Sequence, residues 1–93
     1  MHRDLIRSTG FVRKLRRCLK RQPDAIGEVE ATLLLLSEDA FDPRLKTHKL
    51  AGDLEGICAC SVGYDLRILF EFVHHEGAEA VLLLTLGTHD AVY

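Results

Sequence analysis

Tryptophan is absent from this sequence of 93 residues, and proline and cysteine are rare, with two and three residues respectively. Long apolar segments are also absent, since the longest runs are Leu33–Leu36 and Ala80–Leu84. A membrane helix needs about 20 apolar residues in succession, so the sequence predicts no membrane span. The apolar share of 47% and the charged share of 28% are typical of a globular protein. We expect a single domain over residues 1–93, because this length is too short for two hydrophobic cores.

The cysteines and the amino terminus indicate a reducing compartment. Cys58 and Cys60 are two residues apart in an expected strand, so their side chains share one face, where a disulfide between them is geometrically awkward. We interpret these two residues and Cys18 as small buried hydrophobic groups. Residues 1–5 alternate charged and apolar side chains and lack the features of a secretory signal. We therefore expect a cytoplasmic protein.

Positive charge is concentrated at the amino-terminal end of the chain. Eight of the twelve basic residues lie in the first 21 positions, against one acid, Asp4. The other basic residues are Arg44, Lys46, Lys49 and Arg67, among thirteen acids. A basic stripe of this kind indicates either a phosphate-facing surface or a solvated helix face, and the sequence leaves both readings open.

Two helices are expected after a short first strand at residues 1–7. Ser8 or Thr9 can cap the first helix through its hydroxyl group. Pro23 ends that helix and suits the first turn of a second helix, which should end near Ser37. The predicted buried stripes are Phe11, Leu15, Cys18 and Leu19 in the first helix, and Ile26, Val29, Leu33 and Leu36 in the second.

Three strands are expected in the second half, after a loop that extends to about Gly52. They cover residues 57–62, 65–72 and 80–86, with tight turns at 63–64 and 74–77. In the middle strand Leu66, Ile68, Phe70 and Phe72 should point inward, and the last strand is apolar enough to be buried on both faces. The order βααβββ predicts an α+β fold in which two amino-terminal helices pack on one face of a small antiparallel sheet.

Three blocks of the second half resemble the RelE/ParE toxin superfamily, and most closely its YafQ-like branch. The first block, residues 46–56, contains His48 within a His-x-Leu-x-Gly core. The second, residues 64–70, contains Asp65 and Arg67, and the third is the carboxy-terminal stretch from Gly87 to Tyr93, which contains His89. The blocks occur in the order and spacing of the family. The resemblance implies the RelE-like fold and the toxin of a type II toxin–antitoxin system, with a cognate antitoxin as partner in a hetero-oligomer.

The resemblance also implies a metal-independent endoribonuclease that cleaves mRNA, in the family commonly on the ribosome, and it implies no cofactor. Cleavage by the RNA's own 2′-hydroxyl needs a base, an acid and a cation that neutralises the phosphorane. His48 and His89 suit the two proton-transfer roles, in either assignment, and Arg67 suits the phosphate. Asp65 could orient a histidine or act as base. Lys46 and Lys49 would add positive potential, and Tyr93 could stack on a base.

One position departs from the family. YafQ-like enzymes usually carry another histidine four residues before the strand acid, where this chain has Ser61. This departure leaves open a decayed toxin that only binds its antitoxin. The superfamily also leaves open a ParE-like poison of DNA gyrase that is not a nuclease. The paired histidines favour the nuclease. His74, His75 and Glu76 do not have the spacing of a metal site, so we expect no bound metal. The sequence leaves open the codon preference and the antitoxin's identity.

Overall fold

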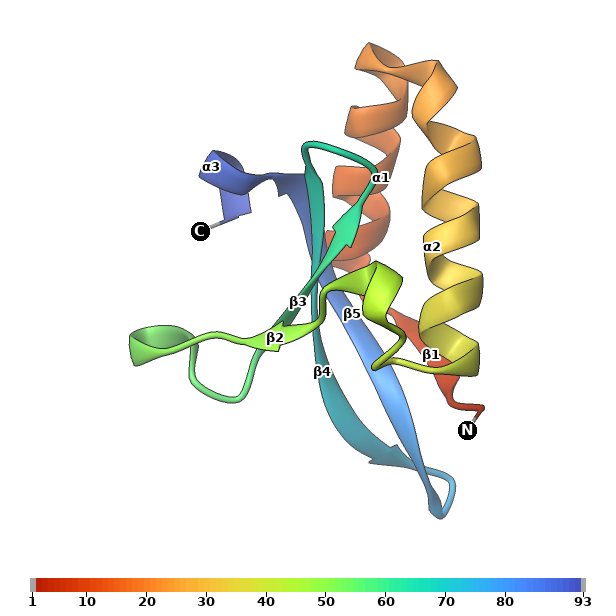
Figure 1. The fold of residues 1–93 in the computed structure, drawn as a ribbon, viewed down its shortest axis with the longest axis vertical. Coiled ribbons are helices and arrows are strands. Elements are labelled where there is room, and N and C mark those ends of the chain that lie inside the picture. The colour runs from red at the N-terminus through yellow and green to blue at the C-terminus, as the bar shows by residue number, and fades with distance from the viewer. Residues whose placement is uncertain (1, 93) are drawn as a thin grey trace.

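A computed structural model describes residues 2–92 of the chain. It contains three helices and five strands among these residues, joined by short 3-10 turns (Figure 1). In chain order the elements are β1 (Asp4–Arg7), α1 (Thr9–Arg21), α2 (Ile26–Glu38), β2 (His48–Lys49), β3 (Cys58–Val62), β4 (Leu66–His75), β5 (Ala78–Thr88) and α3 (His89–Val92).

The five strands form one sheet in the order β1-β5-β4-β3-β2. Neighbouring strands are antiparallel except for β1 and β5, which are parallel and pair Asp4–Arg7 with Ala80–Leu83. The expected α+β fold is confirmed. The parallel pair is an addition that the pattern of β1 alone does not reveal, because a four-residue strand carries no mark of its partner's direction.

Helices α1 and α2 lie side by side on one face of the sheet, and α3 lies on the other side (Figure 1). The core between the sheet and the two long helices contains Leu66, Ile68 and Phe70 of β4, together with Cys58, Cys60 and Val62 of β3. From the helices it contains Phe11, Val29, Leu33 and Leu36. Phe72, the fourth predicted inward residue of β4, is partly buried against this core. The three cysteines are free thiols, and burial raises the pKa of Cys60 to about 12. Their interpretation as small hydrophobic groups is confirmed for Cys58 and Cys60, while Cys18 is half-buried.

The predicted buried stripes differ from the structure at four residues. Leu15, Cys18 and Leu19 of α1 are only partly buried, and Ile26 of α2 is exposed. Ile26 is 40% exposed, because it is the first residue of α2 and lies beside the connection from α1, which extends beyond the sheet (Figure 1). Thr32, which was not predicted in the stripe, is buried and donates a hydroxyl hydrogen bond to the Glu28 carbonyl at 2.8 Å. The buried stripe therefore begins at Val29.

The strand boundaries differ from the predicted ones in three places. The expected loop before Gly52 contains β2, a strand of two residues that pairs with β3. Asp65 lies in the turn before β4 instead of within the strand. His74 and His75 belong to β4, because the hairpin turn contains only Glu76 and Gly77, whose positive φ values of 52° and 82° suit a two-residue hairpin connection.

The residue that caps α1 forms a hydrogen bond to β5 at the position where the pairing of β5 with β4 is irregular. The Ser8 hydroxyl oxygen accepts a hydrogen bond from the Phe11 amide at 3.0 Å, which confirms Ser8 as the cap of the helix. The same hydroxyl donates to the carbonyl of Leu84 at 3.2 Å. Leu84 is the residue at which the β4–β5 register shifts, since Leu69 pairs with Thr85 and Phe70 with Leu83. The cap therefore joins α1 to a β-bulge.

Candidate functional site

The candidate site lies on the sheet face that α1 and α2 leave uncovered. Core residues alternate along β4, so Arg67 between Leu66 and Ile68 points to the opposite face. In the ladder Arg67 pairs with Ser61 of β3 on one side and with Gly87 of β5 on the other. These three residues form one row across the sheet, in which only the serine and the arginine carry side chains.

A shallow hollow of about 590 Å³ includes Ser61 and Arg67 of this row. It lies where the end of β3, the β3–β4 turn, the start of β4 and the end of β5 meet. Its lining residues are Lys46, Ser61, Gly63, Tyr64, Asp65, Arg67, Thr88, His89 and Asp90. The hollow therefore gathers four of the residues predicted from sequence, namely Lys46, Asp65, Arg67 and His89.

Arg67 is half-buried at the floor of this hollow. One terminal nitrogen of its guanidinium donates a hydrogen bond to the backbone carbonyl of Leu66 at 2.9 Å. A guanidinium has five N–H donors, so this bond holds the group while most of its donors remain for a ligand. Because Gly87 faces Arg67 across the ladder, no side chain from β5 stands over the guanidinium in that row.

His89 begins α3, directly after β5, and its side chain is 62% exposed. Its Nδ1 lies 3.6 Å from a carboxylate oxygen of Asp90, a contact that becomes an ion pair when the ring is protonated. Asp90 also lines the hollow and was not predicted as a site residue.

His48 lies beside the hollow without lining it. It pairs with Ala59, and Ala59 is two residues before Ser61, so His48 faces the same side of the sheet one row away from Arg67. Its Nδ1 lies 3.0 Å from the backbone carbonyl of Lys46. A carbonyl only accepts, so this contact is a hydrogen bond when Nδ1 carries the proton, and Nε2 is then the basic nitrogen of the ring.

Asp65 is exposed in the β3–β4 turn, close to the end of α1. The proximity is visible in the thiol of Cys18, whose pKa is raised first by burial and then by the negative charge of Asp65. The turn itself depends on Gly63, which adopts a left-handed φ of +57° and has the Glu28 carboxylate of α2 against its Cα. The turn thus links the site to both long helices.

Lys49, like His48, does not line the hollow. Lys49 pairs with Cys58, whose thiol is in the core, so Lys49 faces the helix side at the sheet edge and lines a separate hollow with Phe72. Tyr93 lies outside the described residues. Sequence reasoning missed Tyr64, whose side chain lines the hollow and which is 96% exposed. The sequence feature that could have revealed it is an aromatic residue at the tip of a tight turn, because such a residue is not needed there for core packing.

No three histidine, cysteine, aspartate or glutamate side chains of residues 2–92 come together in a group that could hold a metal ion. Over the same residues, no helix has the length and apolar character needed to cross a membrane.

Comparison with protein-family models gives no match, and neither does comparison with curated protein sequences. Solved structures do match. YafQ from E. coli superposes with a TM-score of 0.80 at 19% identity, over 98% of each chain. The E. coli DinJ–YafQ toxin–antitoxin complex gives 0.78 at 20% identity, over 100% of this chain and 99% of the other. A YoeB/ParE toxin from Agrobacterium tumefaciens gives 0.75 at 10% identity, over 92% and 98%. This chain therefore has the RelE/YafQ-like toxin fold, as its sequence blocks predicted.

Two glycine substitutions test whether the β3–β4 turn is conformationally constrained. Gly63→Ala should destabilise the protein by about 1–2 kcal/mol, because an L-residue is disfavoured in the left-handed region. Gly27→Ala, in α2, should stabilise it by about 0.5–1 kcal/mol, since nothing lies within 4 Å of the added Cβ and alanine favours a helix. Urea unfolding of both variants measures the difference. A Gly63→Ala protein as stable as wild type would contradict the constraint.

Proposed function

We propose that residues 1–93 form the toxin of a type II toxin–antitoxin system, a metal-independent endoribonuclease that cleaves mRNA on the ribosome. The observation that carries the proposal is the gathering of Arg67, His89 and Asp65 in one hollow, with His48 one row away, on a RelE/YafQ-like fold. These residues come from three sequence blocks that are far apart in the chain. The sheet register brings them to one face.

The proposed reaction is attack of the 2′-oxygen of RNA on the adjacent phosphorus. The base removes the 2′-hydroxyl proton, the P–O2′ bond forms, and the P–O5′ bond breaks. The acid gives its proton to the departing 5′-oxygen, so the products are a 2′,3′-cyclic phosphate and a 5′-hydroxyl. No water enters this first step, which needs only side chains as proton donor and acceptor.

Each residue has a role that follows from its position. Arg67, fixed by its bond to the Leu66 carbonyl, would hold two phosphate oxygens and neutralise the charge that develops on them. His89, whose side chain is exposed in the hollow, suits the acid that protonates the departing 5′-oxygen. His48, with Nε2 as its basic nitrogen, suits the base. Asp65 and Lys46 at the rim would orient a histidine and attract the phosphate.

Tyr64 is a further candidate for contact with RNA. An exposed aromatic ring at the tip of a turn offers a face on which an unpaired base can stack, and such stacking contributes about 1–3 kcal/mol per base. Tyr93 stays a prediction of the same kind. Lys49, which faces the helix side, is omitted from the proposed RNA contacts.

The proposed partner is an acidic antitoxin that covers the site. The E. coli DinJ–YafQ complex shows a protein of this fold bound to an antitoxin. A second function, poisoning of DNA gyrase, is kept because one matching structure is described as a YoeB/ParE toxin. The two histidines on the hollow face favour the nuclease, because gyrase binding needs no proton-transfer groups. Intact RNA together with broken DNA in arrested cells would select the gyrase function.

Three substitutions test the proposed roles. His48→Ala and His89→Ala should each lower the rate of RNA cleavage by roughly 10²–10⁴-fold, and Arg67→Ala by about 10²–10³-fold. Single-turnover cleavage of a labelled RNA measures these rates. All three side chains are outside the core, so thermal stability and antitoxin binding should be retained.

His74→Ala and His75→Ala are matched controls, because these exposed histidines stand at the far end of β4 and should leave the rate unchanged. Wild-type rates in both His48→Ala and His89→Ala, with unchanged folding, would place the active site elsewhere.

Ser61→His tests the position where the chain departs from the family. Ser61 is half-buried, lines the hollow and pairs with Arg67, so a histidine there would reach the same phosphate. The variant should cleave at least about tenfold faster, within the range that a positioned acid or base contributes, and its pH–rate profile should gain a titration. An unchanged rate and profile would mean that this position takes no part in proton transfer.

Chelation tests the absence of a metal from the mechanism. Cleavage should persist in excess EDTA, because the proposed donors and acceptors of protons are all side chains. The products should carry a 2′,3′-cyclic phosphate or the 3′-phosphate derived from it, which gel mobility before and after acid treatment distinguishes. Loss of activity in EDTA with recovery on adding a divalent ion would contradict the mechanism.

A further inference from the structure

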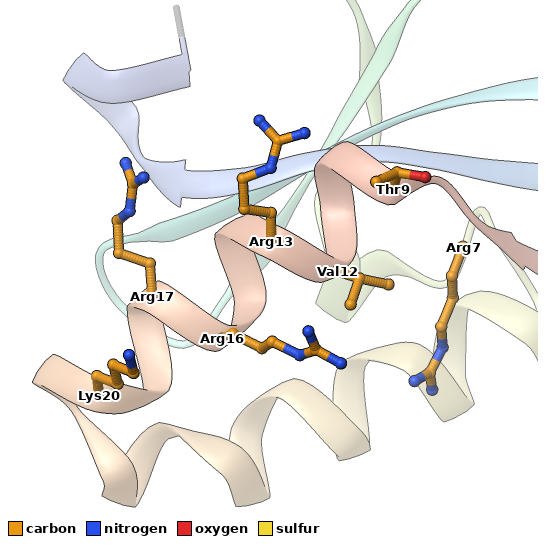
Figure 2. Close-up of a pocket in the computed structure, with 7 residues that line it drawn as sticks. All are labelled: Arg7, Thr9, Val12, Arg13, Arg16, Arg17 and Lys20. Atoms are coloured by element: carbon orange, nitrogen blue, oxygen red, sulfur yellow. The ribbon is translucent and has the colours of Figure 1, made fainter.

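A second hollow, of about 560 Å³, runs along α1 on the outside of the molecule. Figure 2 shows its side chains: one threonine, one valine and five cations. The cations are Arg7, Arg13, Arg16, Arg17 and Lys20. We call this surface the α1 groove. It has no role in the proposed cleavage chemistry.

The cations of the α1 groove have no internal counter-charge. None of them forms a side-chain hydrogen bond or ion pair with another of residues 2–92, and no acid occurs between positions 4 and 24 of the sequence. Arg13 is three residues before Arg16 and four before Arg17, so like charges are neighbours on the helix surface and repel one another. Repulsion between these arginines therefore lowers the stability of the free protein, and a bound polyanion would reduce this repulsion.

The α1 groove is continuous with the candidate active site. Arg17 also lines a third hollow, which it shares with Lys14, Arg21 and Thr88, and Thr88 lines the candidate active site as well. Figure 2 shows Arg13 and Arg17 pointing toward the end of β5, where the chain passes into α3, while Arg7 and Arg16 point to the side of α2. The cations of α1 therefore lie next to the end of β5, and Thr88 there also lines the hollow that contains His89.

The residues that line the α1 groove indicate which class of ligand it would bind. Four of its five cations are arginines, whose planar forks match phosphate oxygens. Val12 is the one apolar residue among its lining residues, so most of the groove presents charged side-chain ends. The 13 residues of α1 span about 20 Å, which is long enough for several successive phosphates.

We propose that the α1 groove binds the phosphate backbone of the substrate RNA outside the cleavage site. This inference rests on the proposed ribonuclease function. In the proposed complex, the hollow around Arg67 holds the scissile phosphate. The α1 groove holds the backbone of the flanking nucleotides of the same strand and does not recognise their sequence. The helix then contributes affinity, and the sheet face contributes chemistry.

Binding can be measured apart from cleavage by using RNA whose 2′-hydroxyls are methylated, because this RNA lacks the nucleophile of the proposed reaction. The probes are labelled strands of about four and about twenty nucleotides, followed by fluorescence anisotropy over a series of salt concentrations. The variant carries Arg13→Gln, Arg16→Gln and Arg17→Gln. The matched control is Arg44→Gln, whose arginine is already paired with Asp42 at 2.9 Å.

For the long strand, the triple variant should bind at least about tenfold more weakly, and its slope of log affinity against log salt should fall by about two, at about 0.7 for each lost contact. Binding of the short methylated strand should be unchanged, and so should the rate of cleavage of an unmodified strand of the same length. Arg44→Gln should match wild type in every measurement. The melting temperature of the triple variant should be equal to that of wild type or higher, because neighbouring like charges have been removed.

The proposal is overturned if the triple variant binds the long strand with wild-type affinity and slope, or if short and long strands weaken equally. It is also overturned if the only loss is affinity for the antitoxin, which would make the groove a protein interface. Failure of the proposed function looks different, since wild-type protein would then bind the methylated strand but cleave no unmodified RNA.

Discussion

The alternation of side chains along β4 is the constraint on which the rest of this molecule depends. β4 is the middle strand of five, and its even-numbered residues from Leu66 to Phe70 are buried under α1 and α2. The period of two then requires Arg67 to face away from the core. A register slip of one residue would bury this guanidinium and expose the core positions, so the energy that folds the protein also fixes the phosphate-binding candidate.

The neighbouring strands complete the site through their register. Ser61 and Gly87 stand on either side of Arg67, and the β-bulge at Leu84 determines which residues of β5 share that face. Before the bulge Val81 and Leu83 point into the core, and after it Leu86 does, which leaves Thr85 and Gly87 on the site face. The cap of α1 donates to the carbonyl of Leu84, so helix, bulge and site are held as one unit.

The two surfaces proposed to bind RNA, the hollow around Arg67 and the α1 groove, differ in the charges that they contain. The hollow combines Arg67, Lys46 and His89 with the carboxylates of Asp65 and Asp90, so it contains charges of both signs and groups of the types that the proposed chemistry needs. The α1 groove contains cations only, which suits attraction of a polyanion over a distance and offers no proton transfer. A domain of this size can thus separate affinity from chemistry by placing them on different elements.

The sequence by itself determined the α+β fold, the inward face of β4, the cap at Ser8 and the blocks that contain His48, Arg67 and His89. These features are local, since periodicity and capping depend on residues within a few positions of one another. Only the tertiary structure decided that β1 pairs in parallel with β5, that β5 contains a bulge, that Lys49 faces the helix side, and that Tyr64 shares the hollow with His89. Each of these depends on which strands become neighbours and in what register, and that choice is made by the packing of the whole chain, which no short window of sequence encodes.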